Sequence, residues 1–246
     1  MEKTVSGRAN AMQYHQIQRA VFHARPNRFL AEVSLPDGTP VCAHVRNTGR
    51  CAELLVPGAR VFLEYSKNPN RRTPCDLVAV EKAVAGGTRL INMDSSAPNQ
   101  VVGEWLAAGG LGPVEQLRAE YTLGDSRFDF CAVRNGRPLL VEVKGCTLEE
   151  DGVARFPDAP TLRGLKHIRE LTARAQQGWD CCVLVVIQMK GVTRFCPNWA
   201  TQPAFGTALA EAAAAGVEVR AMDCRVTPDA LLLDAPVPVD LTPPQA

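Results

Sequence analysis

The run DCCVLVVIQM at residues 180–189 constrains the fold of this chain more than any other segment. Its residues do not alternate between apolar and polar types, as they do in a strand that faces water on one side. A continuous apolar run between turns is typical of a strand that is covered on both faces. The segment therefore predicts the central strand of a sheet with helices on both sides, which is an α/β layer architecture.

Helix and strand patterns surround this run from about residue 92 onward. The spacing of apolar residues and the glycines that follow predict helices at residues 97–112, 160–178 and 203–216. Alternating and apolar runs predict strands at residues 116–124, 127–134, 138–146 and 217–226. The proline-rich tail at residues 228–246 is expected to lie along the surface or to fray.

The first third of the chain instead consists of short strand patterns separated by Gly- and Pro-containing turns. These strands are predicted at residues 28–35, 39–45, 59–67 and 75–83. Such short, closely spaced strands are typical of a small barrel of the oligonucleotide-binding (OB) type. One short helix is predicted inside it, at residues 48–55. We therefore expect an OB-like barrel in residues 1–90 and an α/β domain with a mixed central sheet and a Pro-rich tail in residues 91–246.

Acidic side chains interrupt two of the predicted apolar strands, in SRFDFCAVRNGRPLLVEVKG at residues 126–145. The Asn-Gly turn predicts a hairpin, and alternation along its strands puts Asp129 on one sheet face with Glu142 and Lys144. Two neighbouring carboxylates repel each other and are costly to bury unless a cation lies between them. The alternative is a solvated face on which Arg127 and Lys144 pair with the acids.

The chemistry of this group favours a divalent metal ion. Oxygen ligands from Asp129 and Glu142, completed by water, suit Mg²⁺ or Mn²⁺. Lys144 would then orient or deprotonate an attacking water and stabilise negative charge on a phosphate. We expect no organic cofactor.

The motif SRFDF followed by VEVKG resembles the site of PD-(D/E)XK nucleases. The wider chain resembles the sugar fermentation stimulation protein A (SfsA) family in segments such as AHVRNTGRCAELLVPGARVFL and ARFPDAPTLRGLKHIREL, and the likeness extends over residues 28–226. The resemblance implies an OB-like barrel, a restriction-endonuclease-like second domain, DNA binding and a role in regulating sugar metabolism genes. It also implies a further metal-binding acid on the preceding helix, a position that Glu104 matches. An ordinary exposed helix glutamate is the alternative for Glu104.

Three more residues are second-rank candidates for the site. Glu120 either contributes to it, pairs with Arg118 or is simply exposed. Asp158 either serves the site or acts as a cap or turn residue before the helix at 160–178. His167, on that helix, is either a proton carrier or a structural histidine.

Basic and polar residues in three segments are candidate DNA contacts. The first segment resembles a phosphate cradle, the second is a basic loop, and the third begins the long helix, whose N-terminus favours an anion. A solvated loop is the alternative for the first two. The candidates are His44, Arg46, Asn47, Thr48 and Arg50, then Arg71 and Arg72, and then Arg163 and Lys166. Because aromatic residues make up only 6% of the chain, contact through phosphates is favoured over base stacking.

Composition limits the setting of these activities. The net charge of +1 requires that any nucleic acid be held by a local basic patch. Nine scattered cysteines without a C-x-x-C pair favour reduced thiols over a disulfide or zinc framework. With no apolar leader or membrane span in the sequence, we expect a cytoplasmic protein.

Two main functional hypotheses follow. The first is a metal-dependent nuclease that hydrolyses phosphodiester bonds in DNA, or in RNA. The second is a non-catalytic DNA-binding protein or regulator of sugar metabolism genes. A nuclease-fold component of an RNA-processing or repair complex is a third interpretation, and a homodimer stays open because nucleases of this class often pair two sites.

Overall fold

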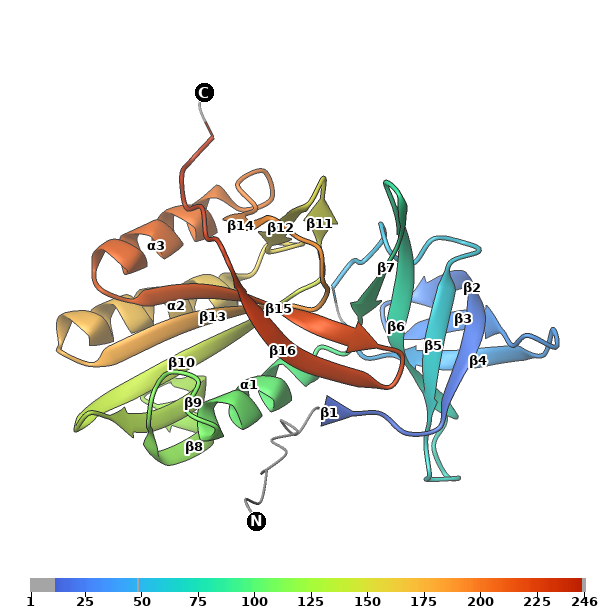
Figure 1. The fold of residues 1–246 in the computed structure, drawn as a ribbon, viewed down its shortest axis with the longest axis horizontal. Coiled ribbons are helices and arrows are strands. Elements are labelled where there is room, and N and C mark those ends of the chain that lie inside the picture. Colours follow the sequence, from blue (N-terminus) through green and yellow to red (C-terminus); the bar gives the residue numbers. More distant parts are fainter. Residues whose placement is uncertain (1–11, 48, 245–246) are drawn as a thin grey trace, which may run out of the picture.

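The computed structural model describes residues 12–47 and 49–244, which form two sheet-based domains arranged side by side (Figure 1). The N-terminal domain is a small barrel, as the sequence predicted, and it has five strands, of which the first was not predicted. Its strands are β2 (Ile17–Asn27), β3 (Leu30–Ser34), β4 (Pro40–Val45), β5 (Arg60–Tyr65) and β6 (Cys75–Val84). Parallel pairing of β4 with β6 closes the barrel. The strand β7 (Gly87–Asn92) pairs antiparallel with β6 and leads toward the second domain.

The predicted helix at residues 48–55 is wrong for the part that the structure describes. Cys51 adopts a left-handed φ of 45°, which ordinary helices exclude. The amides of Leu54 and Leu55 both donate to the Cys51 carbonyl, so the segment makes a single turn before Pro57.

The second domain is built on a seven-stranded mixed sheet in the order β1-β16-β15-β13-β10-β9-β8. Its strands are β1 (Met12–Gln13), β8 (Glu115–Leu123), β9 (Ser126–Arg134), β10 (Arg137–Cys146), β13 (Asp180–Ile187), β15 (Glu218–Thr227) and β16 (Ala230–Val237). β13 pairs in parallel with both β10 and β15, and all its residues from Cys181 to Ile187 are buried. The predicted central strand is therefore confirmed.

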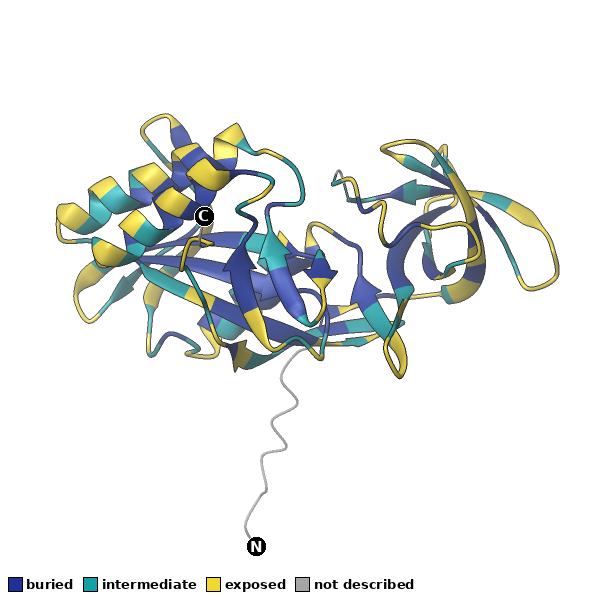
Figure 2. Ribbon diagram, turned by 90° about the horizontal axis from the view of Figure 1, so that it is seen from above, coloured by how far each residue is buried: buried dark blue, intermediate teal, exposed yellow. Residues whose placement is uncertain are grey.

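Helices cover both faces of this sheet. α2 (Leu162–Gln176) and α3 (Pro203–Ala214) pack on one face, and α1 (Ala97–Ala107) lies on the other (Figure 1). Leu165, Ile168 and Leu171 of α2 join one apolar cluster, whereas Val102 and Leu106 of α1 join the other. In Figure 2 the buried strands lie beneath helices whose outer faces are exposed.

Part of the C-terminal segment is a strand, so the expectation of a surface-bound or fraying tail is wrong for Ala230–Val237. This strand, β16, pairs with β15, and Leu231 and Leu233 are buried while the residue between them is less so. The alternation lets β16 bury one face despite Pro236, which lies beside a bulge in β15. A separate small sheet contains β11 (Glu149–Glu150), β12 (Val153–Phe156) and β14 (Arg194–Pro197).

A buried ion-pair group connects the barrel to the second domain. Lys82 of β6 and Arg89 of β7 both pair with Oε2 of Glu149 in β11, at 2.8 Å and 2.9 Å. Burial alone would raise the pKa of Glu149, but the bonds from Lys82, the Gly152 amide and Arg89 hold that pKa below its ordinary value. The carboxylate is therefore ionised in the folded protein and links the two domains.

Candidate active site

The hairpin of β9 and β10 opens where its acidic residues lie. Regular pairing between the two strands ends at Phe130 and Val141. Beyond that point, the amide of Val143 on β10 donates to Oδ2 of Asp129 at 2.7 Å instead of to a backbone carbonyl of β9. The Asp129 carboxylate thus replaces a backbone acceptor and is drawn against the strand that carries Glu142. The structure brings these two acids together, as the hairpin pattern predicted.

Asp129 is oriented from two sides. Besides the Val143 amide, Nδ2 of Asn99 on α1 donates to Asp129 Oδ1 at 2.7 Å. Burial raises the pKa of Asp129, and the nearby negative charge of Glu142 raises it further. The two hydrogen bonds act in the opposite direction without cancelling the rise. The negative charge of Glu142 therefore disfavours ionisation of Asp129.

Glu142 is only 3% exposed, and its two oxygens have different surroundings. Oε1 accepts hydrogen bonds from Nζ of Lys144 and from Nδ1 of His167, the latter at 2.6 Å. Oε2 is buried without a hydrogen-bond partner in the part of the chain that the structure describes. Burial would raise the pKa of Glu142, but the His167 bond and the Lys144 charge outweigh it and lower the pKa. The lowered pKa favours the ionised form of the buried Glu142 carboxylate, in which Oε1 is hydrogen-bonded and Oε2 is not.

These oxygens fit a hard divalent cation. Oε2 of Glu142 has an open lone pair, and the Asp129 carboxylate is near enough to Glu142 for the two charges to interact. Across residues 12–47 and 49–244, no group of three or more His, Cys, Asp or Glu side chains gathers around one point. Mg²⁺ is nevertheless commonly held by one or two carboxylates, with water and substrate phosphates supplying the other ligands.

The third predicted metal ligand is not brought to this pair. Glu104 accepts a hydrogen bond from Gln100, one turn earlier on α1, at 3.2 Å. The α1 residue that reaches the site is Asn99, because it lies at the helix end nearest to Asp129. Apolar periodicity gave no signal for Asn99.

Glu120 also lies outside the acid pair. Its carboxylate is exposed and pairs with Arg127 at 3.0 Å, rather than with Arg118. This ion pair is on the β8–β9 surface. Glu120 is therefore an exposed residue, which is one of the alternatives that the sequence left open.

Several predicted DNA contacts are instead bound within the protein. Arg71 makes a two-pronged ion pair with Asp76, and Nδ1 of His44 lies 2.9 Å from the same carboxylate. Arg46 pairs with buried Asp94 at 2.9 Å, between the barrel and α1. Sequence pattern alone could not reveal the partners of His44 and Arg46, since they lie on distant elements, whereas Asp76 follows Arg71 by only five positions.

Asn47, Gly49 and Arg50 of the barrel are held from both domains. Arg25, which the sequence did not single out, donates to the carbonyls of Asn47, Gly49 and Arg50. The Arg50 amide donates to Oδ2 of Asp158 at 3.0 Å. Asp158 therefore anchors the barrel loop and does not contact the acid pair. Thr48 lies outside the described residues.

Other candidates remain available to a ligand. Arg50, Arg72 and Arg163 have exposed side chains without an acid partner among residues 12–47 and 49–244. Lys166 is exposed on α2 near Glu170. Arg163, Lys166 and His167 line a pocket of about 530 Å³ between the start of β9 and α2.

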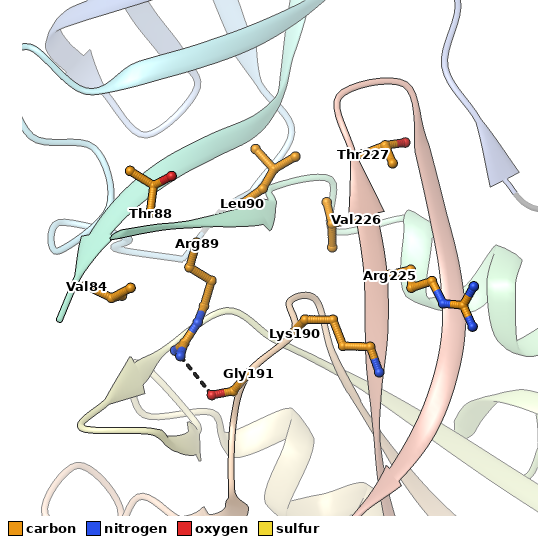
Figure 3. A pocket seen from close by; sticks show the side chains of 9 residues that line it. All are labelled: Val84, Thr88, Arg89, Leu90, Lys190, Gly191, Arg225, Val226 and Thr227. Atoms are coloured by element: carbon orange, nitrogen blue, oxygen red, sulfur yellow. Dashed lines mark hydrogen bonds between the residues drawn. The ribbon is translucent and has the colours of Figure 1, made fainter. Parts of the chain in front are cut away.

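A second pocket, of about 500 Å³, lies between β7 and β15 (Figure 3). Three cations line it, but each is engaged: Arg89 donates to the Gly191 carbonyl, while Lys190 and Arg225 pair with Asp234. None of its lining residues comes from β9, β10 or α2. The acid pair is therefore the candidate site.

The architecture is an OB barrel joined to an α/β domain with a curled mixed sheet. Two family models match it: "SfsA N-terminal OB domain" at residues 24–93 and "Sugar fermentation stimulation protein RE domain" at residues 96–230. The chain belongs to the sugar fermentation stimulation protein family. No helix of the described residues is long and apolar enough to cross a membrane.

Individual relatives agree with this assignment. A sugar fermentation stimulation protein homolog of Desulfitobacterium hafniense (strain Y51) is 48% identical over 220 residues, which cover 89% of this chain and 94% of the relative. A homolog from Ruminiclostridium cellulolyticum is 45% identical over 231 residues, covering 94% and 100%. The structure of Pyrococcus furiosus SfsA in complex with Ca²⁺ has a TM-score of 0.82 at 24% identity, covering 94% of this chain and 98% of that one. That structure has the same fold.

Proposed function

We propose that this protein is a divalent-metal-dependent nuclease that hydrolyses phosphodiester bonds in DNA. The observation that carries the proposal is the unpartnered, buried Oε2 of Glu142 beside Asp129. Membership of a family with an OB domain and an RE domain supports it.

Asp129 and Glu142 would hold the metal ion, for which we propose Mg²⁺ or Mn²⁺. Together with burial, the charge of Glu142 raises the pKa of Asp129, and binding a cation would offset both effects and would satisfy the unpaired oxygen of Glu142. When bound, such an ion stabilises negative charge on a phosphate and makes water a stronger nucleophile. The Ca²⁺ named for the Pyrococcus furiosus protein supports divalent binding in this family.

The remaining site residues orient these groups and supply positive charge. Lys144 is bonded to Glu142, so its ammonium is positioned to stabilise the charge that develops on a phosphate and to orient water. Asn99 and the Val143 amide fix Asp129, while His167 fixes Glu142. In this account His167 is a positioning residue.

Nucleic acid would be held through its phosphates. Arg50, Arg72, Arg163 and Lys166 present exposed positive charge, which is suited to backbone contact without sequence readout. His44, Arg46 and Arg71 would act indirectly, by stabilising the barrel.

The proposal is tested by a cleavage assay on labelled duplex, single-stranded and branched DNA with Mg²⁺, Mn²⁺ or EDTA. We expect metal-dependent cutting that Asp129→Asn and Lys144→Ala each reduce by about 100-fold or more, with DNA binding retained. Glu104→Gln, an acid change on α1 outside the pair, is the matched control and should cut normally. DNA binding without cutting under any metal would instead favour the non-catalytic DNA-binding protein.

A further inference from the structure

The pocket between β9 and α2 adjoins the acid pair. His167 lines it, and Nδ1 of the same residue lies 2.6 Å from Glu142 Oε1. With a volume of about 530 Å³, the pocket has room for a phosphate and part of a nucleoside. A group bound there would be separated from Glu142 by the His167 side chain.

The pocket carries excess positive charge. Three of its lining residues are cations, Arg127, Arg163 and Lys166, and one is an acid, Asp125. α2 begins at Leu162, another lining residue, so the partial positive charge of the helix N-terminus adds to the side-chain charges. The pocket is therefore suited to an anion.

The cations differ in how far they are already neutralised. Arg127 pairs with Glu120 at 3.0 Å, and Lys166 lies 3.6 Å from Glu170. Arg163 is exposed and has no acid partner in residues 12–47 and 49–244. Arg163 is thus the lining cation most available to a ligand.

A second, independent observation also indicates a missing ligand. Ser126 lines the pocket and is only 4% exposed, yet its hydroxyl has no hydrogen-bond partner among the described residues. Buried hydroxyls are nearly always paired, because an unpaired one loses its hydration without compensation. An oxyanion in the pocket would accept that hydrogen bond.

We propose that this pocket is a subsite for the terminal phosphate monoester of a nucleic-acid strand, so that strand ends are the preferred substrate. An internal phosphodiester has one negative charge and two free oxygens, whereas a terminal monoester has three free oxygens and up to two charges. The Ser126 hydroxyl, the Arg163 guanidinium and the Lys166 ammonium offer more donors than two oxygens can use. Leu162, which is 82% exposed beside them, provides an apolar contact for the terminal nucleoside. This subsite rests on the proposed nuclease function, for which it names the preferred substrate.

The test is a binding competition in EDTA with single-stranded DNA hexamers that carry a 5′-phosphate, a 3′-phosphate or only hydroxyl ends. We expect one phosphorylated hexamer to bind about tenfold more tightly than the hydroxyl-ended one. Arg163→Ala should reduce that preference to about twofold or less. Arg169→Ala removes an exposed cation of the same helix that does not line the pocket, so it should leave the preference unchanged.

Equal affinity for all three hexamers in the unmodified protein would overturn the subsite. A preference for the phosphorylated hexamer that survives Arg163→Ala would also overturn it. The same holds for a preference that Arg163→Ala and Arg169→Ala abolish equally. Because no cleavage is needed, the result is separate from the nuclease proposal. A preference for phosphorylated hexamers without DNA cleavage would support the subsite and reject the nuclease. DNA cleavage without that preference would support the nuclease and reject the subsite.

Discussion

Nδ1 of His167 lies 2.6 Å from Oε1 of Glu142, and the His167 ring packs against Phe128 with 5.6 Å between ring centroids. The first contact ties α2 to β10, and the second ties it to β9. His167 therefore joins the three elements around the opened hairpin. The sequence left His167 between proton carrier and structural residue, and these contacts support the positioning role that we propose for it.

Replacing this histidine should destabilise the fold as well as the site. We expect His167→Ala to lower the free energy of unfolding by roughly 2–3 kcal/mol, because a buried carboxylate loses a charged hydrogen bond and the core loses a ring. Urea denaturation measures the loss. His23→Ala, at an exposed histidine bonded to Ser34, should change stability by less than about 0.5 kcal/mol. Equal effects of the two changes would refute the positioning role.

The charge of Glu142 should be visible in the titration of Asp129. Since burial and then the Glu142 charge raise the pKa of Asp129, the variant Glu142→Gln should lower that pKa. Carbon-13 NMR of the Asp129 carboxyl group, recorded in EDTA, measures it. Glu104→Gln should leave the Asp129 titration unchanged. An Asp129 pKa that does not respond to Glu142→Gln would show that the two acids are not coupled.

Glu149 should contribute strongly to the stability of the domain contact. Glu149→Gln removes the charge that pairs with Lys82 and Arg89, and we expect a loss of roughly 3 kcal/mol in unfolding free energy. Glu150→Gln, at the neighbouring exposed acid that pairs with Arg155, is the control and should cost less than about 1 kcal/mol. Denaturation of both variants at neutral pH tests the difference, and similar losses would contradict it.

The same carboxylate gives a pH dependence of known sign. The folded-state pKa of Glu149 is below the ordinary value of 4.5, so folding favours its ionised form. Its contribution to stability is therefore complete above pH 4.5 and is lost as the pH falls through the lower, folded-state pKa. The stability difference between the unmodified protein and Glu149→Gln should shrink in that acidic range. A difference that stays constant down to about pH 3 would disprove this linkage.

The barrel loop should not tolerate a side chain at Gly49. A Cβ placed there would clash with Oδ2 of Asp158, so we expect Gly49→Ala to cost about 1–3 kcal/mol. In an Asp158→Ala background the obstructing carboxylate is gone, and the added cost of Gly49→Ala should fall by about 1 kcal/mol. A double-mutant cycle measures this coupling, and full additivity would exclude the proposed clash.

The sequence was sufficient where local pattern decides structure. The apolar run at residues 180–189 predicted β13, and the Asn-Gly turn predicted the β9–β10 hairpin that pairs the acids. Both features depend on alternation and turn chemistry within a short segment. The barrel was predicted for the same reason.

Contacts between distant segments were not visible in the sequence. His44 is a residue type that suits a DNA contact, but it is paired with Asp76, 32 positions away. Asn99 reaches Asp129 across 30 positions, and no periodicity marks it. The prolines near the C-terminus concealed β16, because its pairing depends on a bulge in the partner strand.

Calorimetric titration of the metal-free protein with Mn²⁺ examines the proposed metal site without any substrate. We predict saturable binding that Asp129→Asn and Glu142→Gln each weaken by about tenfold or more, while Glu104→Gln binds as the unmodified protein does. Binding that is unchanged in all three variants, or no binding in the unmodified protein, would contradict a metal site at this pair of acids.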